Sequence, residues 1–168
     1  MDKFMNEAIK EAQDGIRNGH GGPFGVCIVR DGKIIGRGHN RVILNHDCTC
    51  HGEMEAIRDA CKNTNSFDLS GAHLYTTGMP CPMCLGAIQW ASIEKLYYGC
   101  SIEDNASVGF RDDLFAEGIN INHEKLTFSV EQLERDECWK VLEEYHNMDK
   151  ELYWFIINNY ARIKEVIL

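Results

Sequence analysis

Two short motifs in this chain carry metal-ligating side chains, and they constrain the fold because they have to meet in space. The first is His51-Gly52-Glu53, and the second is Pro80-Cys81-Pro82-Met83-Cys84. One imidazole and two thiolates are ligands that zinc prefers, and a zinc ion with three protein ligands keeps its fourth tetrahedral position open for water. We therefore predict a Zn²⁺ site with His51, Cys81 and Cys84 as ligands.

The spacing of these residues predicts where the ion lies relative to the helices. Cys81 and Cys84 are three residues apart, so their sulfurs face the same way on one helical turn, and a proline at the start of that helix is favourable. His51 and Glu53 are two apart, so they converge only if the ion lies beyond the end of a helix. We expect two helix N-termini to point at one ion, where their partial positive charge favours thiolates. Glu53 is then the candidate acceptor for the proton of the activated water.

Two non-enzymatic interpretations of the cysteines stay open. Residues 81–84 also have the C-x-x-C spacing of a redox-active dithiol. A structural zinc site would need a fourth protein ligand, and Cys48 and Cys50 are the nearest candidates. Metal content and thiol titration distinguish both from a catalytic zinc site.

Length and composition predict one domain, residues 1–168. Of these residues 44% are hydrophobic and 26% are charged, which is ordinary for a globular protein. No apolar run of about 18 residues predicts a membrane span, and the charged, amphipathic start of the chain lacks the apolar core of a secretory signal. We therefore expect a cytoplasmic protein whose eight cysteines are not a disulfide framework.

The charge balance argues against a polyanionic substrate. Seventeen lysines and arginines are scattered among 26 aspartates and glutamates, and the formal net charge is −9. Binding a long nucleic acid requires clustered basic residues. The charge therefore favours a small neutral molecule as the substrate.

Patterns along the chain predict an α/β sandwich with helices on both faces of a sheet. Helical spacing of apolar residues predicts an opening helix that ends near residues 18–19, and helices are also expected at about 52–61, 82–90, 133–146 and 149–166. Residues 31–32 have the composition of a hairpin turn, whereas residues 101–119 show no clear periodicity. Strands are expected at 24–29, 33–38, 72–76, 95–99 and 126–130.

At its zinc motifs the chain resembles the cytidine-deaminase-like superfamily, whose signature is H-x-E followed by P-C-x-x-C. It is most similar to the branch that acts on free purine bases, because Gly109-Phe110-Arg111-Asp112-Asp113 is similar to a segment of bacterial guanine deaminases. The resemblance covers about residues 1–119. It implies a three-layer α/β/α sandwich with a mixed five-stranded sheet, followed by extra C-terminal helices.

The resemblance also implies roles for individual residues. It gives the same three zinc ligands and the same proton carrier as the spacing does. It further implies that Asn40 hydrogen-bonds the base, that Phe24 stacks on it and that Asp112 reads an edge of its ring. A core position for Phe24 and a loop cap for Asp112 are the plain structural alternatives.

The chain departs from the family pattern in two places that bear on substrate and assembly. Gly52, which we include among the substrate-contact candidates, separates His51 from Glu53. Fungal cytosine deaminases also have glycine between these two catalytic residues, so a pyrimidine substrate stays open. Residues 131–168 form a longer C-terminal helical extension than expected. Bacterial guanine deaminases exchange such segments between subunits and close the site with a tyrosine, which implies a homodimer with Tyr153 as the candidate. Whether this chain exchanges the segment stays open.

These observations predict a zinc-dependent hydrolase that converts guanine to xanthine and ammonia. Alternatives with the same chemistry are deamination of cytosine or of another base or nucleoside. Deamination of adenosine in tRNA uses the same zinc residues but is disfavoured by the net charge.

Overall fold

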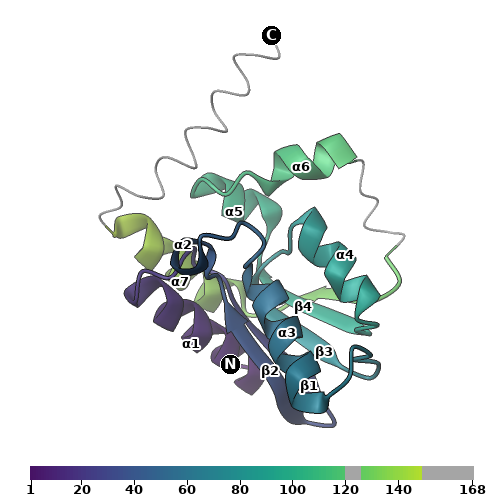
Figure 1. Cartoon of the computed structure of the whole chain (residues 1–168). Coiled ribbons are helices and arrows are strands. Elements are labelled where there is room, and N and C mark those ends of the chain that lie inside the picture. Colours follow the sequence, from purple (N-terminus) through teal and green to yellow (C-terminus); the bar gives the residue numbers. More distant parts are fainter. Residues whose placement is uncertain (120–125, 149–168) are drawn as a thin grey trace.

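A mixed five-stranded sheet forms the centre of the computed structural model, which describes residues 1–119 and 126–148 (Figure 1). The strand order is β2-β1-β3-β4-β5. Strand β1 is antiparallel to both of its neighbours, whereas β3, β4 and β5 are parallel. This confirms the predicted mixed sheet. The strands are β1 Gly25–Arg30, β2 Lys33–His39, β3 His73–Gly78, β4 Lys95–Cys100 and β5 Ser129–Gln132.

Helices cover both faces of the sheet and complete the three predicted layers (Figure 1). One face carries α1 Lys3–Arg17 and α7 Arg135–Asn147, and their buried side chains form one apolar cluster with that face. The other face carries α3 Gly52–Thr64 and α4 Pro82–Trp90, which pack in a second cluster. The sequence therefore predicted α4 at its observed bounds and the other three within a few residues.

The hairpin between β1 and β2 turns at the predicted pair of residues. Asp31 and Gly32 have φ angles of 52° and 70°. Positive φ at both central residues is the type I′ geometry, which matches the twist of the flanking strands. The turn pairs Arg30 with Lys33, and a register shift between Ile28 and Val29 then brings Gly25 opposite His39.

Four elements differ from the sequence prediction. Residues 101–119 contain α5 Ile102–Ser107 and α6 Asp112–Ile119, and the loop after β2 contains the short helix α2 Val42–Asn45. Helix α5 is held by a capping box, in which Ser101 and Asp104 each bond the other's backbone N–H, so apolar periodicity does not reveal it. The predicted strand at 126–130 begins only at Ser129, because Phe128 is buried in the apolar cluster before pairing with β4 starts.

Two predictions fall on the C-terminal segment. The helix predicted at 149–166 and Tyr153 lie outside the described residues. In the part of the chain that the structure describes, no helix is long and apolar enough to span a membrane. The assignment of residues 1–168 to one domain stays a prediction.

The first turn of α3 is held by close contact with the edge strand β2. A Cβ atom added at Gly38 would overlap backbone atoms of α3, among them Ala56 N and Gly52 O. Only glycine allows this approach. The contact matters for the site, because the first turn of α3 carries Glu53 and directly follows His51.

We predict that Gly38→Ala destabilises the protein, because the added methyl group pushes α3 away from β2. Overpacking of this kind costs about 1–3 kcal/mol, and each kcal/mol lowers Tm by about 2–4 °C in a protein of this size. Thermal unfolding followed by circular dichroism measures the effect. Gly86→Ala in α4 is the control, since a Cβ there meets no atom within 4 Å. The control should raise stability by about 0.5–1 kcal/mol, and a Gly38→Ala protein as stable as wild type would contradict the prediction.

Candidate active site

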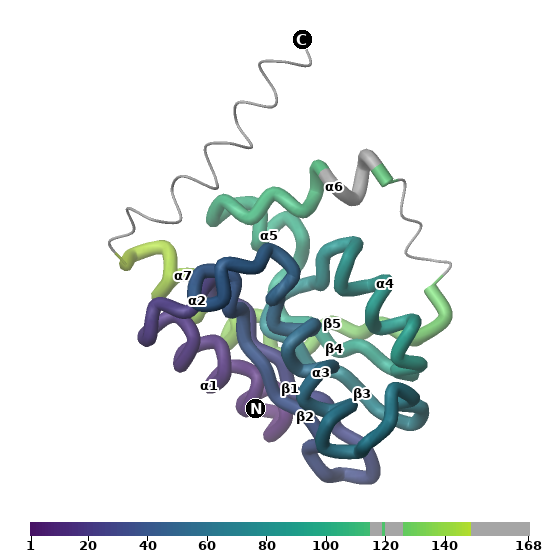
Figure 2. Tube along the Cα trace, in the orientation of Figure 1, coloured from purple at the N-terminus to yellow at the C-terminus, as the bar shows by residue number. Residues whose placement is uncertain are grey.

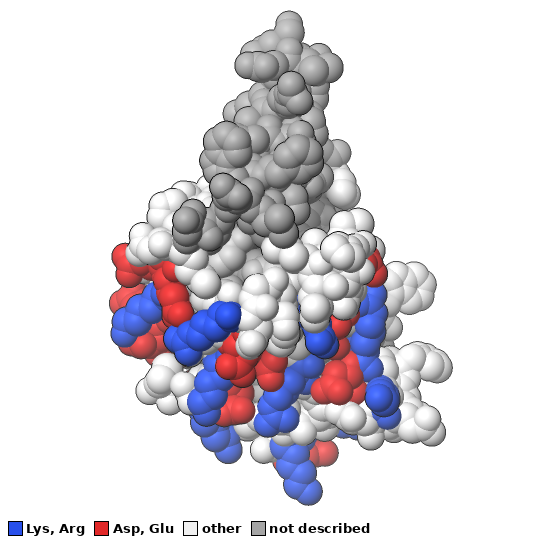
Figure 3. Space-filling model, turned by 60° about the vertical axis from the view of Figure 1, so that its left-hand side comes forward, with Lys and Arg blue, Asp and Glu red and all other residues white. Residues whose placement is uncertain are grey.

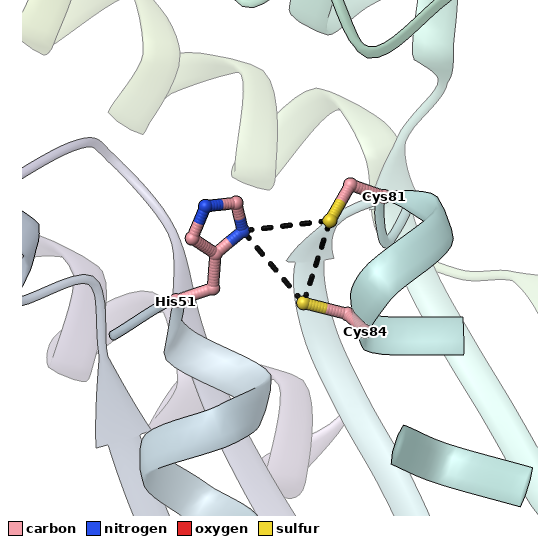
Figure 4. Close-up of side chains that lie close together, drawn as sticks. All are labelled: His51, Cys81 and Cys84. Atoms are coloured by element: carbon pink, nitrogen blue, oxygen red, sulfur yellow. Dashed lines mark hydrogen bonds between the residues drawn. The ribbon is translucent and has the colours of Figure 1, made fainter. Parts of the chain in front are cut away.

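Three ligand atoms meet at one point: His51 Nδ1, Cys81 Sγ and Cys84 Sγ (Figure 4). The two sulfurs are 3.6 Å apart, and Nδ1 lies 3.6 Å from Cys81 Sγ and 3.7 Å from Cys84 Sγ. Tetrahedral zinc with Zn–S of about 2.3 Å and Zn–N of about 2.0–2.1 Å requires separations of about 3.5–3.8 Å between such ligand atoms. The three residues therefore fit a zinc ion without rearrangement.

Two of these residues are the N-caps of the helices that bring them together. His51 precedes α3 and Cys81 precedes α4, and neither side chain bonds the N–H groups of its own helix. The imidazole and the thiol are therefore left for a metal. Pro82 is at the start of α4, where its missing N–H costs nothing. Two helix N-termini converge on one point, as the spacing of the motifs predicted.

No closed four-ligand site forms within residues 1–119 and 126–148. Neither of the two cysteines predicted as alternative ligands joins the group of three. Cys48 is exposed, and buried Cys50 Sγ accepts a hydrogen bond from Asn45 Nδ2 at 3.4 Å. The described residues therefore leave a fourth coordination position for water, as a catalytic zinc site requires.

Acidic groups crowd around the three ligands. Burial raises the pKa of Glu53, and burial together with the charge of Cys81 raises the pKa of Asp112 to about 7. The hydrogen bond with Cys84 lowers the pKa of Cys81 to about 4, and the same bond raises the pKa of Cys84. Two carboxyl groups and two thiols that can each become an anion are poorly tolerated in one buried space without a cation. The donor set thus fits a divalent cation in charge as well as in geometry.

His51 is tuned by its neighbouring thiolate. Burial lowers the pKa of His51, but the hydrogen bond with Cys81 and its negative charge outweigh burial and raise it to about 9. In the absence of metal, this contact therefore favours the protonated form of His51 and the ionised form of Cys81. The metal takes the place of the imidazole proton when it binds.

All segments that surround the pocket come from one edge of the sheet. Because β1 is antiparallel to both neighbours, β2, β3 and β4 run the same way and end at the edge where β1 begins. Figure 2 shows α5 and α6 at this same end of the sheet. The pocket beside the ligands is lined by Phe24, Asn40, His51, Glu53, Met79, Cys81, Phe110 and Asp112.

Asn40 is buried in the pocket wall directly after β2. Its backbone N–H donates to Phe24 O at 2.8 Å, and its side-chain Oδ1 accepts from Val42 N at 3.2 Å. With Oδ1 engaged, Nδ2 is the remaining donor group of this pocket-lining amide. A side chain at Gly21 would overlap Asn40 Oδ1, so glycine is required beside this wall.

Two aromatic rings form the apolar part of the wall. Phe24 and Phe110 lie edge to face, with ring centroids 4.8 Å apart and planes at 81°. Phe24 is half-buried and lines the pocket, and its stacking on a base stays a prediction. Phe110 was missed as a site residue, although it belongs to the segment singled out in the sequence. Its position two residues before Asp112 was the available signal.

Asp112 is the first residue of α6 and lines the same pocket. Its neighbours pair with each other: Arg111 Nη2 lies 2.7 Å from Asp113 Oδ2. The Asp112 side chain takes no part in that pair and lines the pocket, and its role in reading an edge of the base stays a prediction beside that of a loop cap.

Gly52 is buried and does not line the pocket, and a Cβ added there would lie 2.9 Å from Phe24 O. Tyr153 lies outside the described residues. Met79 and Thr76, which donates to Glu53, were not predicted, since a single apolar or hydroxyl residue in or next to a strand carries no spacing signal.

Comparison with known families identifies the first part of the chain. The model of the cytidine and deoxycytidylate deaminase zinc-binding region matches residues 1–100. This range contains all three ligands and Glu53.

Named relatives of the whole chain fall into two groups. The chain is 42% identical over 130 residues to the guanine deaminase of Bacillus subtilis strain 168, which covers 77% of this chain and 83% of that protein. It is 37% identical over 142 residues to the tRNA-specific adenosine deaminase of Buchnera aphidicola subsp. Schizaphis graminum, covering 84% and 91% of the two chains. Sequence similarity thus extends to more than one substrate class.

Solved structures agree with the fold. The guanine deaminase of Bacillus subtilis has a TM-score of 0.69 at 37% identity, over 90% of this chain and 98% of that one. The guanine deaminase of Nitrosomonas europaea has a TM-score of 0.76 at 25% identity, over 86% and 84%.

We predict that replacing a metal ligand removes the metal. Wild type should contain one zinc per chain, and Cys84→Ser should lose most of it, because a serine hydroxyl is a poor ligand for zinc beside one thiolate and one imidazole. Elemental analysis of dialysed protein measures the zinc. Cys48→Ser, which changes an exposed cysteine outside the group of three, should keep it. Equal zinc in both variants would contradict the assignment of the site.

Proposed function

The chain belongs to the cytidine and deoxycytidylate deaminase family, and we propose that it deaminates a free purine base, with guanine as substrate and xanthine and ammonia as products. The observation that carries the proposal is that Asn40 and Asp112 both line the pocket that also holds Glu53. One presents an amide donor and the other a carboxylate acceptor. The edges of guanine offer both acceptors and N–H donors, so the two side chains complement it.

The aromatic wall supports a flat, neutral ligand. A base that enters between the ligands and Asn40 lies against Phe24 and Phe110, whose faces and edges favour contact with another ring. Such a ligand leaves no charge to be neutralised inside a pocket that is already rich in acidic groups.

His51, Cys81 and Cys84 would hold the zinc ion. When bound, zinc supplies a Lewis acid and lowers the pKa of water to about 7. Glu53 lies in the first turn of α3 and is 4% exposed, so bulk water does not compete for its proton. It takes a proton from the attacking water and passes it to the ring nitrogen and then to the departing amine. One C–O bond forms and one C–N bond breaks, and the sum is guanine plus water giving xanthine plus ammonia.

The similarity to tRNA-specific adenosine deaminases makes tRNA the second candidate substrate. The charge distribution weighs against it. The formal net charge is −9, and on the face drawn in Figure 3 lysines and arginines alternate with aspartates and glutamates instead of forming a basic patch. A phosphate backbone binds to clustered cations. The proposal therefore keeps a small base as the substrate, with cytosine as the alternative that Gly52 leaves open.

The proposal extends to the assembly. The family resemblance supports a cytoplasmic homodimer, and the outer side of α4 supplies an apolar surface that suits a second copy. Met83 and Trp90 are seven residues apart on this helix and are 38% and 88% exposed. Residues at this spacing share one face of a helix.

We predict that the zinc-loaded protein releases ammonia from guanine but not from guanosine, adenine, cytosine or cytidine. Glu53→Gln should keep its zinc and lose turnover by about 10²–10⁴-fold, because the amide cannot carry the proton. A coupled ammonia assay and elemental analysis give both readouts. Activity on cytosine alone would keep the chemistry and overturn the substrate, and near-normal turnover by Glu53→Gln would overturn the mechanism.

We further predict that Asp112→Asn lowers kcat/KM for guanine by about 10–100-fold, because a hydrogen bond to a charged acceptor is worth about 1.5–3 kcal/mol. Asp113→Asn is the matched control, since that carboxylate pairs with Arg111 and does not line the pocket. Steady-state kinetics should leave the control within about twofold of wild type. Equal losses in the two variants would argue against contact between Asp112 and the base.

A further inference from the structure

A buried hydroxyl joins the proposed proton carrier to the centre of the sheet. Thr76 Oγ1 donates to Glu53 Oε1 at 3.2 Å, and Thr76 is completely buried. Its strand, β3, is paired on both sides: Thr76 lies opposite Val26 of β1 and opposite Tyr98 of β4. The hydroxyl therefore sits on a part of the fold that has little freedom to move.

Glu53 needs such a partner. A glutamate side chain has three rotatable bonds, so helix geometry alone does not determine where its carboxylate lies. The carboxylate must nevertheless face the open position beside the three zinc ligands, because a proton moves only over hydrogen-bonding distance. A bond from the sheet to one oxygen, Oε1, restricts the positions that the carboxylate can take.

The second bond of the same hydroxyl holds it in place. Thr76 Oγ1 also lies 3.1 Å from Gly78 O, at the end of β3 just before the segment that leads to Cys81. A hydroxyl has one proton, so it must donate that proton to Glu53 when the carboxylate is ionised, whereas a protonated Glu53 can donate to the hydroxyl while the hydroxyl donates to Gly78 O. The contact with Glu53 is therefore possible in either protonation state of the carboxyl group.

We propose that Thr76 is a positioning residue, which orients the Glu53 carboxylate against the metal-ligand set. The role rests on the proposed function, in which Glu53 carries the proton. Thr76 does not line the pocket, so it acts through Glu53 and not through contact with the base.

The next residue offers a comparison within the same strand. Thr77 is also completely buried, and its hydroxyl makes two bonds as well, donating to Pro23 O at 3.2 Å and accepting from Gly25 N at 3.1 Å. Because side chains alternate along a strand, it lies on the opposite face from Thr76 and does not reach Glu53. It holds the segment that carries Phe24, so its loss should act on base binding.

The experiment compares wild type with Thr76→Val, Thr76→Ser and Thr77→Val, all loaded with zinc. Thr76→Val should lower kcat for guanine by about 10–100-fold with KM within about threefold, because the carboxylate is misplaced and the pocket is intact. Thr76→Ser should restore kcat to within about threefold of wild type, since it keeps the hydroxyl. Thr77→Val should instead raise KM. All four proteins should contain one zinc per chain.

Crystal structures of zinc-loaded wild type and Thr76→Val provide a readout that does not depend on substrate. The Glu53 carboxylate should leave its wild-type rotamer in the variant. An unchanged rotamer, a kcat within about twofold of wild type, or a Thr76→Ser protein as slow as Thr76→Val would each overturn the proposal. If wild type does not turn over guanine, the proposed function fails, and the two crystal structures still decide the role of Thr76.

Discussion

The direction of strand β1, opposite to that of its two neighbours, determines at which end of the sheet the candidate active site lies. Strand β1 is antiparallel to β2 on one side and to β3 on the other, so β2, β3 and β4 all end at the edge where β1 begins. Phe24 precedes β1, Asn40 follows β2, the ligand-bearing start of α4 follows β3, and Asp112 lies beyond β4. Four segments distant in sequence therefore reach one pocket without any long excursion of the chain. Binding at the carboxyl ends of strands is the general rule for sheets covered by helices.

The positions of the zinc ligands depend on how closely helices α3 and α4 approach the sheet. Helix α3 begins against Gly38, where only a hydrogen atom fits, and α4 begins directly after β3. The N-cap side chains of both helices, His51 and Cys81, belong to the metal-ligand group and do not bond the N–H groups of their own helices. The buried acidic groups beside them need a cation for charge balance, so metal binding and stability of this region are coupled.

The sequence predicted the parts of the fold in which local chemistry decides the conformation. Helix α4 has a proline at its start and ends where predicted, and the turn at Asp31-Gly32 has residues that tolerate positive φ. The ligand motifs predicted the convergence of helix N-termini because their spacing is itself geometric. Helices α5 and α6 could not be predicted in this way, since they are short and depend on capping and on contacts with each other. The position of Thr76 beside Glu53 became visible only in three dimensions, because the two residues lie on different elements, β3 and α3.

The division of labour between packed helices and connecting segments has an evolutionary consequence. The three candidate metal ligands and Glu53 lie at the starts of helices that are packed against the sheet, where substitutions disturb the core. Phe24 and Asn40 lie in connecting segments, and Asp112 begins the short helix α6. Under the proposed function, selection can therefore change the residues that contact the base while the residues of the reaction stay the same. Such modularity explains how proteins that act on a free base and proteins that act on a base within tRNA both resemble this chain at about 40% identity.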